Sequence, residues 1–298
     1  MAEYSSMIIG HVTMDSNTDH LGNTVHLAGG AVLFSSASAY ALGHNVVAVT
    51  KMADKDKAER LGSFTLPSEN IFCIDSAASC DMVNVYHTPD KERRTSKCTS
   101  KGVAFDASEI PDLDVSLYHL AGLVYGDFDA KLIKSLAKDA PVAVDVQAFL
   151  RRVADDGSMY FEDWHEKKEC LPFITYLKTD AAEAEIMTGL SDRREAAKLL
   201  YAWGAQEILI THNTEVLVYD GKEFYACPIR ARNLSGRTGR GDTTFAAYIN
   251  ERLTKSVPEA LLTATATVSL KMETAGPFKG TRADVEKYID EFYADLKS

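Results

Sequence analysis

The sequence has few of the residues that cross-link a chain or hold a structural metal. Its 298 residues include 5 cysteines with no C-x-x-C pair, and its 8 histidines form no H-E-x-x-H motif. An odd, scattered set of cysteines indicates reduced thiols rather than a disulfide framework. The spacing of cysteine and histidine also argues against a structural zinc site. We therefore expect an ordinary globular chain without covalent or metal cross-links.

Long apolar runs and an excess of positive charge are also missing. No stretch resembles an 18-residue apolar span, so we expect no membrane segment. The chain has 32 basic and 43 acidic residues, which gives a net charge of −11. This balance disfavours nonspecific binding to nucleic acid or anionic lipid. Because the first residues lack the basic-then-apolar pattern of an export signal, we expect a cytoplasmic protein.

The sequence does contain a regular alternation of short apolar runs and helical patterns. Candidate strands are Met7–Gly10, Val46–Thr50, Ile71–Asp75, Ser116–Leu120, Val142–Val146, Phe173–Lys178 and Glu207–Thr211. Candidate helices are Gly30–Leu42, Asp129–Lys138, Ala181–Thr188, Asp192–Trp203, Asp242–Leu253, Pro258–Glu273 and Arg282–Leu296. This alternation is typical of an α/β domain with a mostly parallel sheet.

Two stretches do not fit the alternation. They lie within residues 13–27 and 73–100, and Met82–His87 in the second alternates apolar and polar residues. Such a pattern is typical of a strand in a sheet with one wet face. We predict that these stretches form a small β lid, and that residues 1–12, 28–72 and 101–298 form the main domain. The alternative is two irregular loops.

The segment Gly236–Asp242 carries the strongest chemical signal. Gly239 and Gly241 bracket Arg240 directly before an amphipathic helix, and Asp242 falls in its first turn. Glycine permits close approach of a ligand, and a helix start leaves backbone N–H groups unpaired, so the segment can bind an anion. A carboxylate beside those donors can accept a proton from an attacking hydroxyl. The alternative is that Asp242 is simply an acid favoured at a helix start.

This segment resembles the C-terminal signature of the ribokinase/PfkB carbohydrate kinases, written D-T-x-G-A-G-D. Three other parts resemble the family in the expected order: Gly10–Asp15, Gly29-Gly30 with Leu42-Gly43, and Lys178–Glu183 with Thr188-Gly189. The resemblance implies a ribokinase-like three-layer α/β/α sandwich with a small β lid. It also implies transfer of the γ-phosphoryl group of ATP to a hydroxyl of a sugar, sugar acid or polyol.

The resemblance also implies roles for individual residues. Asp242 would be the general base, and the backbone of Gly239, Arg240 and Gly241 would form the anion hole. Asp15, Gly29 and Gly30 would contact the hydroxyls of the substrate. Thr13 and Phe34 stand near positions where relatives use asparagine, so they are candidate substrate contacts, although Phe34 could equally belong to the core.

On the donor side, Lys178, Asp180 and Glu183 match the family element that lies near the phosphates. Glu183, with Asp180, would organise Mg²⁺ through bound water, and the alternative for Glu183 is a solvated acid on a helix face. Thr211 and Asn213 belong to the adenine-side loop, but that loop lacks the two glycines of the family pattern. ATP and Mg²⁺ are therefore the expected cofactors, with the base preference open.

One departure affects the anion hole directly. The first Asp of the signature, which helps bind a monovalent cation in many relatives, is Gly236 here, and Arg237 follows it. We infer that Arg237 or Arg240 could supply the positive charge itself, while the alternative is that both lie on the surface. Asp145 lies at the end of a predicted strand with Arg151 close behind, and both are weaker candidates for contacting substrate or phosphate. The alternative for each is a turn or a surface ion pair.

The expected acceptor is a small sugar or polyol. A nucleoside kinase of the same fold is the main alternative, because Phe34 and other aromatic side chains could stack on a base. A metabolite-binding regulator without activity is a further alternative, but it would not need Asp242 between such glycines. Because lids in this family often pair between subunits, we also expect a homodimer formed through the lid.

Overall fold

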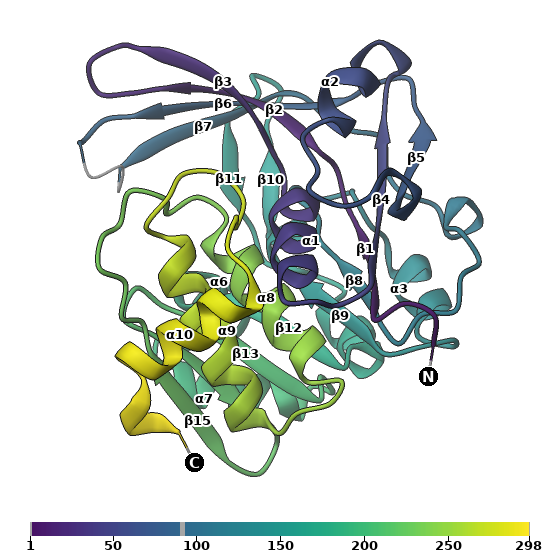
Figure 1. Ribbon diagram of the computed structural model, residues 1–298. Helices are drawn as coiled ribbons and strands as arrows, with labels where there is room; N and C mark the ends of the chain where they lie inside the picture. The colour runs from purple at the N-terminus through teal and green to yellow at the C-terminus, as the bar shows by residue number, and fades with distance from the viewer. Residues whose placement is uncertain (1, 90–92, 298) are drawn as a thin grey trace.

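A large sheet runs through the centre of the protein (Figure 1). The computed structural model describes residues 2–89 and 93–297. The sheet has nine strands in the order β15-β14-β13-β12-β9-β8-β1-β4-β5. Their bounds are β1 (Ser6–Ile9), β4 (Val46–Met52), β5 (Ile71–Asp75), β8 (Tyr118–Leu120), β9 (Val142–Asp145), β12 (Tyr176–Asp180), β13 (Glu207–Thr211), β14 (Glu215–Tyr219) and β15 (Phe224–Pro228). From β5 to β13 all neighbours pair in parallel, and β14 and β15 extend one edge in antiparallel pairing.

Apolar side chains cover both faces of this sheet. Along β9, Val142 and Val144 belong to one buried cluster, whereas Ala143 between them belongs to another. Successive side chains of a strand point to opposite faces. Both faces are therefore buried, as parallel sheets require.

Helices form a layer on each face of the sheet. They are α1 (Ala31–Ala41), α2 (Lys57–Leu61), α3 (Ala130–Leu136), α4 (Gln147–Leu150), α5 (Lys167–Cys170), α6 (Ala181–Thr188), α7 (Arg193–Ala202), α8 (Arg240–Glu251), α9 (Val257–Lys271) and α10 (Arg282–Phe292). Side chains of α3, α6 and α7 pack against one face, and those of α1, α8, α9 and α10 pack against the other. The predicted three-layer α/β/α sandwich is confirmed. Within the described ranges, no helix is long and apolar enough to cross a membrane.

A second sheet lies outside this sandwich. It contains β2 (Thr13–Thr18), β3 (Thr24–Gly29), β6 (Cys80–Tyr86) and β7 (Arg94–Ser100), in the order β3-β2-β6-β7. Figure 1 shows it beyond the end of the large sheet at which β1 leads into β2. β5 ends at Asp75 within the large sheet, although residues 73–75 fall in the segment expected for the lid. Residues 90–92 of that segment lie outside the described residues.

A short hairpin connects the second sheet to the sandwich. It consists of β10 (Arg151–Val153) and β11 (Met159–Phe161), and sequence patterns did not predict it. The backbone N–H of Cys98 in β7 donates to the carbonyl of Gly157, between the two strands, at 2.9 Å. The hairpin therefore holds Arg151 close to the second sheet.

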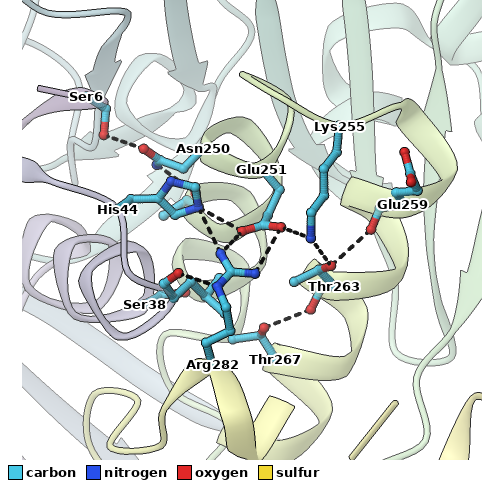
Figure 2. Close-up of polar contacts among 12 residues, drawn as sticks. Ser6, Ser38, His44, Asn250, Glu251, Lys255, Glu259, Thr263, Thr267 and Arg282 are labelled. Carbon is cyan, nitrogen blue, oxygen red and sulfur yellow. Dashed lines mark hydrogen bonds and ion pairs between the residues drawn. The ribbon is translucent and has the colours of Figure 1, made fainter. Parts of the chain in front are cut away.

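A buried polar cluster fixes helix α8 against α1 and α10 (Figure 2). Glu251, at the end of α8, accepts hydrogen bonds from His44 (2.7 Å), Lys255 and Arg282. Burial opposes ionisation of Glu251, but these hydrogen bonds lower its pKa to about 2. Near the start of α8, Ser38 of α1 donates to the carbonyl of Thr243 at 3.0 Å. These contacts hold the start of α8 in place relative to α1.

Candidate active site

The candidate residues gather at the carboxyl ends of the parallel strands. Asp145 ends β9, Asp180 ends β12 and Thr211 ends β13, while β1 leads directly to the second sheet. Helix α8 begins at the same end. Asp242 in its first turn is close enough to Asp145 for their negative charges to interact. Ligand sites of open α/β sheets occur at this end of the strands.

The anion-hole loop, residues Gly236–Asp242, depends on glycine at two places. At Gly236, a Cβ atom would lie 1.7 Å from the carbonyl oxygen of Thr274. Gly239 has φ of 76°, in the left-handed region, and a Cβ there would lie 2.1 Å from the ring of Phe34. A side chain at either position would force the loop away from its neighbours.

The loop presents backbone donors at the start of α8. The N–H of Arg240 donates to the carbonyl of Arg237 at 3.3 Å, so that predicted anion-hole donor is engaged within the loop. The first i→i−4 bond of the helix runs from Thr243 to Gly239 at 2.9 Å. The N–H groups of Gly241 and Asp242 precede that bond and point out of the helix start, where an anion is stabilised.

Asp242 has the properties required of a general base. Its side chain is partly exposed, and burial together with the negative charge of Asp145 raises its pKa to about 6. Positive charges on Lys178, Arg151 and Lys271 oppose this rise. A carboxylate with a pKa just below neutrality is ionised at neutral pH and is still basic enough to accept a proton.

Lys178 connects the anion-hole loop to two buried carboxylates. Its ammonium group lies 2.9 Å from Asp145 and 3.8 Å from Glu183. A Cβ at Gly241 would be 3.2 Å from Lys178 Nζ, so the ammonium lies directly beside the loop. Burial opposes its charge, but the carboxylates of Asp145 and Glu183 raise the pKa of Lys178 above its ordinary value. Lys178 therefore stays charged beside the anion hole.

Glu183 and Asp180 are tied to each other at the start of α6. The carboxylate of Glu183 accepts the backbone N–H of Asp180 at 2.8 Å, and Asp180 Oδ1 accepts the N–H of Glu183 at 2.8 Å. This reciprocal capping box stabilises the first turn of the helix. Glu183 is 4% exposed, and burial raises its pKa. It is therefore a buried member of the site and not a solvated acid on a helix face.

Arg151 brings a further positive charge to the site. Its guanidinium donates to Gln147 Oε1 at 2.5 Å and lies 5.6 Å from the ring centre of Phe161. Burial lowers the pKa of Arg151, and its charge interacts with those of Glu183, Asp145 and Asp242. The sequence had given this arginine only as a weak candidate.

The expected substrate contacts lie on the second sheet and at the start of α1. Thr13 Oγ1 donates to Asp15 Oδ1 at 2.6 Å, and a Cβ at Gly29 would lie 2.6 Å from Asp15 Oδ2. Burial raises the pKa of Asp15, and the Thr13 hydrogen bond opposes that rise. Gly30 caps α1, which in turn packs against the start of α8. The structure thus connects Asp15 and Asp242 through one helix.

Phe34 lies beneath the anion-hole loop. It is 4% exposed, and its ring contacts Gly239 and lies 5.1 Å from the ammonium group of Lys271. This is the core position that sequence analysis gave as the alternative to a substrate contact. The ring supports the loop from behind.

The donor-side candidates lie around the turn between β13 and β14. Thr211 pairs with Val216 across these strands, so the turn that holds Asn213 is short. The guanidinium of Arg237 donates to Asn213 Oδ1 at 3.4 Å. Arg237 therefore extends from the anion-hole loop toward this turn.

Lys271 was not predicted from the sequence. It ends α9, is fully buried, and donates to the carbonyl oxygens of Gly236 (2.6 Å) and Thr238 in the anion-hole loop. The only sequence signal was a lysine at the end of an otherwise apolar and hydroxyl-rich helix. Because lysine is common at helix ends, that signal is weak without the fold.

Comparison with known proteins identifies the family. Residues 83–282 match the pfkB family carbohydrate kinases. A cytidine kinase from Thermococcus kodakarensis is 27% identical over 256 residues, covering 82% of this chain and 86% of that protein. A solved pyrophosphate-dependent kinase of the ribokinase family, complexed with a pyrophosphate analog and myo-inositol, is 29% identical. Its TM-score is 0.84, covering 95% of this chain and 99% of that chain.

More distant structures share the fold. Ribokinase from Arabidopsis thaliana, complexed with ribose and ATP, has a TM-score of 0.75 at 16% identity, covering 97% of this chain and 99% of that one. The matched region is more than half of the present chain, and it includes Asp242 and its loop. The protein is therefore a member of the PfkB family of carbohydrate kinases, with a ribokinase-like fold.

Proposed function

We propose that this kinase transfers a phosphoryl group to a hydroxyl of a small polyhydroxylated molecule, with Asp242 as general base. The observation that carries this proposal is the position of Asp242 beside the N–H groups of the anion-hole loop and the Lys178 ammonium. The carboxylate accepts the proton of the attacking hydroxyl, while the donors and positive charges stabilise the transferring phosphoryl group.

For the acceptor, we propose a sugar or cyclic polyol bound between the second sheet and the start of α1. Asp15, held by Thr13, can accept paired hydroxyl donors of such a molecule. The myo-inositol bound to the pyrophosphate-dependent neighbour supports a cyclic polyol. A nucleoside is the second candidate, supported by the cytidine kinase relative.

For the donor, two candidates remain: ATP, as sequence analysis expected, and pyrophosphate. One contact in this chain favours pyrophosphate. The guanidinium of Arg237 reaches Asn213, in the short turn that lacks the family glycines, so positive charge stands where a nucleotide base would approach. The pyrophosphate-dependent neighbours at 29% and 31% identity support the same choice.

We further propose that Mg²⁺ binds with the donor phosphates and reaches Glu183 and Asp180 through water. Both carboxylates are engaged in the capping box, so they suit water-mediated contacts better than direct ligation. Within the described residues, no three acidic, histidine or cysteine side chains converge to hold a metal. This donor set fits Mg²⁺, which keeps several waters and binds largely through phosphates. When bound, the ion neutralises charge on the phosphates.

We also propose that the second sheet acts as a lid and as the contact of a homodimer. Its β3 strand exposes Val25 (53%) and Leu27 (52%), and Leu21 in the adjoining turn is 74% exposed. Exposed apolar side chains gathered on one strand mark a surface that another molecule covers. A second copy of the lid is the expected partner.

A panel of donors and acceptors tests the proposed reaction. The purified protein is incubated with ATP or pyrophosphate and with myo-inositol, ribose or cytidine, each with Mg²⁺, and the phosphorylated product is detected by phosphorus NMR. We expect product with a sugar or polyol and faster turnover with pyrophosphate than with ATP. Product from cytidine alone would support the nucleoside alternative, and faster turnover with ATP would contradict the donor proposal. No product from any pair would contradict the proposed function.

A further inference from the structure

The ammonium group of Lys271 occupies an unusual position beneath the anion-hole loop. It is fully buried and donates to the carbonyl oxygens of Gly236 and Thr238. Burial lowers the pKa of Lys271 to about 8, and among the described residues Asp242 is the carboxylate whose charge opposes this. A buried charge held mainly by neutral carbonyls is costly. Such a charge requires an explanation beyond packing.

The carbonyl contacts determine which way the loop presents its N–H groups. In a planar trans peptide unit, the C=O and the following N–H point in opposite directions. Because the carbonyls of Gly236 and Thr238 point to Lys271, the N–H groups of Arg237 and Gly239 point away from it. Lys271 therefore turns these donors away from the buried back of the loop.

Neighbouring residues close off the position of the Lys271 ammonium group. The ring of Phe34 covers the ammonium from one side at 5.1 Å. A Cβ at Gly236 would lie 1.7 Å from the Thr274 carbonyl, so a carboxylate side chain at 236 has no room. The guanidinium of Arg237 instead reaches Asn213. Lys271 thus supplies a positive charge at the back of the loop.

We propose that Lys271 is a positioning residue that serves as the built-in cation of the anion hole, so that no monovalent metal ion is needed there. Its ammonium orients the loop donors and adds a fixed positive charge behind the transferring phosphoryl group. Lys178 supplies a second ammonium beside Gly241. This inference rests on the proposed phosphoryl transfer, and it deepens the description of the same site.

Chemical rescue tests the inference. Turnover is measured for the wild-type protein, Lys271→Ala and Lys271→Met in a buffer whose only cation besides Mg²⁺ is tetramethylammonium, and then with added K⁺ or ammonium. We expect the wild-type rate to be unchanged by K⁺. Lys271→Ala should lose about a hundredfold in kcat, the loss typical of an oxyanion-hole donor, and should recover part of it with K⁺ or ammonium. Lys271→Met, whose side chain fills the space, should show the loss without the rescue.

Two controls separate this role from a structural one. Lys287→Met, at an exposed lysine of α10, should keep wild-type turnover. The KM for the acceptor should stay unchanged in the Lys271 variants, because Lys271 contacts the loop and not the second sheet. Strong K⁺ activation of the wild-type protein would overturn the inference. A wild-type kcat in Lys271→Met would also overturn it, and so would a Lys271→Ala variant whose kcat does not rise when K⁺ or ammonium is added.

Anion binding provides a readout that does not depend on turnover. Pyrophosphate binding to the wild-type protein and to Lys271→Met is measured by calorimetry, with circular dichroism to confirm that both are folded. We expect the variant to bind at least about tenfold more weakly, because a desolvated charge near the anion is lost. Equal affinity would overturn the role of Lys271 even if no acceptor were phosphorylated. If the variant binds pyrophosphate more weakly than the wild-type protein but neither protein phosphorylates any acceptor, only the proposed function would be contradicted.

Discussion

At the scale of single residues, the acid strength of Asp242, the proposed general base, sets the pH range expected for activity. Burial and the nearby charge of Asp145 raise the pKa of Asp242 to about 6. A base must be ionised to accept a proton, so its activity falls as the pH drops through this value. Three positive groups limit the rise and keep the carboxylate ionised near neutrality.

The first prediction concerns the acid limb of the pH profile, which is the range where activity falls as the pH drops. In wild-type protein, kcat/KM should fall below pH about 6. In Asp145→Asn the limb should move to lower pH, because the loss of a negative charge lowers the pKa of Asp242 and leaves Lys178 less neutralised. The pH dependence of kcat/KM measures the shift. Asp139→Asn, an exposed carboxylate near the other end of β9, is the control and should leave the limb unchanged. A limb that moves upward in Asp145→Asn would refute this electrostatic account.

The second prediction concerns the left-handed turn of the anion-hole loop. Gly239→Ala places a methyl group 2.1 Å from the Phe34 ring at a φ of 76°. Gly189→Ala is the matched control, because its φ is 74° and no atom lies within 4 Å of the added Cβ. Both variants should lose roughly 1–2 kcal/mol of unfolding free energy from the left-handed conformation.

Only Gly239→Ala should also lose turnover, because the added methyl must move the loop or the ring. Denaturant unfolding and kcat, measured on both variants, provide the comparison. Equal kcat values in the two would mean that Phe34 does not set the position of the loop.

At the scale of elements, Arg60 of α2 anchors the second sheet where its strands leave the sandwich. Its guanidinium donates to the carbonyls of Val12 (3.1 Å) and Cys80 (2.7 Å) and to Asp81 Oδ1 (2.7 Å). Val12 precedes β2 and Cys80 begins β6, so one side chain holds both neighbouring strands. Asp15 lies only a few residues beyond this anchor.

The third prediction follows from this anchor. Arg60→Met should raise the KM for the acceptor by about tenfold or more, since loss of a buried, hydrogen-bonded charge is costly and frees the strand that carries Asp15. The kcat should fall less, because the anion-hole loop is not touched. Lys57→Met is the control: Lys57 lies on the same helix, but its ion pairs with Asp54 and Asp75 involve exposed carboxylates. A fall in kcat at unchanged KM would contradict the assignment of the second sheet to the acceptor.

The same elements show what the sequence could reveal about the site. The glycines and Asp242 could be placed at a helix start because turn residues and helical periodicity are local signals. Lys271 and Arg151 could not be placed, because each reaches the site through tertiary packing. Arg151 lies in a three-residue strand of a hairpin, and Lys271 is far along the chain from the carbonyls that it contacts. Phe34 was ambiguous for the same reason.

The fold was predicted unevenly, and the reasons are physical. The buried strands of the parallel sheet were predicted well because they form continuous apolar runs, as at residues 142–144 of β9. The antiparallel edge strands β14 and β15 were not predicted, although both are largely apolar, because runs of only five residues give little periodic signal. The predicted strand Phe173–Lys178 begins later, at Tyr176, because Leu171–Phe173 form a 3₁₀ turn that includes Pro172. Short hairpins such as β10–β11 gave no periodic signal.

At the scale of the whole molecule, the fourth prediction concerns assembly. If the second sheet pairs between two copies, exposed apolar side chains on β3 and in its adjoining turn lie in the interface. The double variant Leu21→Ser and Val25→Ser should then be a monomer by light scattering under conditions in which the wild-type protein is a dimer. Tyr160→Ser, which removes another exposed apolar side chain (49%), should leave the dimer intact. A wild-type monomer at all tested concentrations would contradict the proposed homodimer.

The proposed function depends on one chemical assignment, that Asp242 removes the proton from the acceptor hydroxyl. Its most direct test is the turnover of Asp242→Asn with the donor and acceptor that the wild-type protein uses. Asparagine has the same shape but cannot accept the proton, so kcat should fall by at least about a hundredfold, while calorimetry shows unchanged acceptor binding. A kcat close to the wild-type value in the folded variant would contradict the assignment.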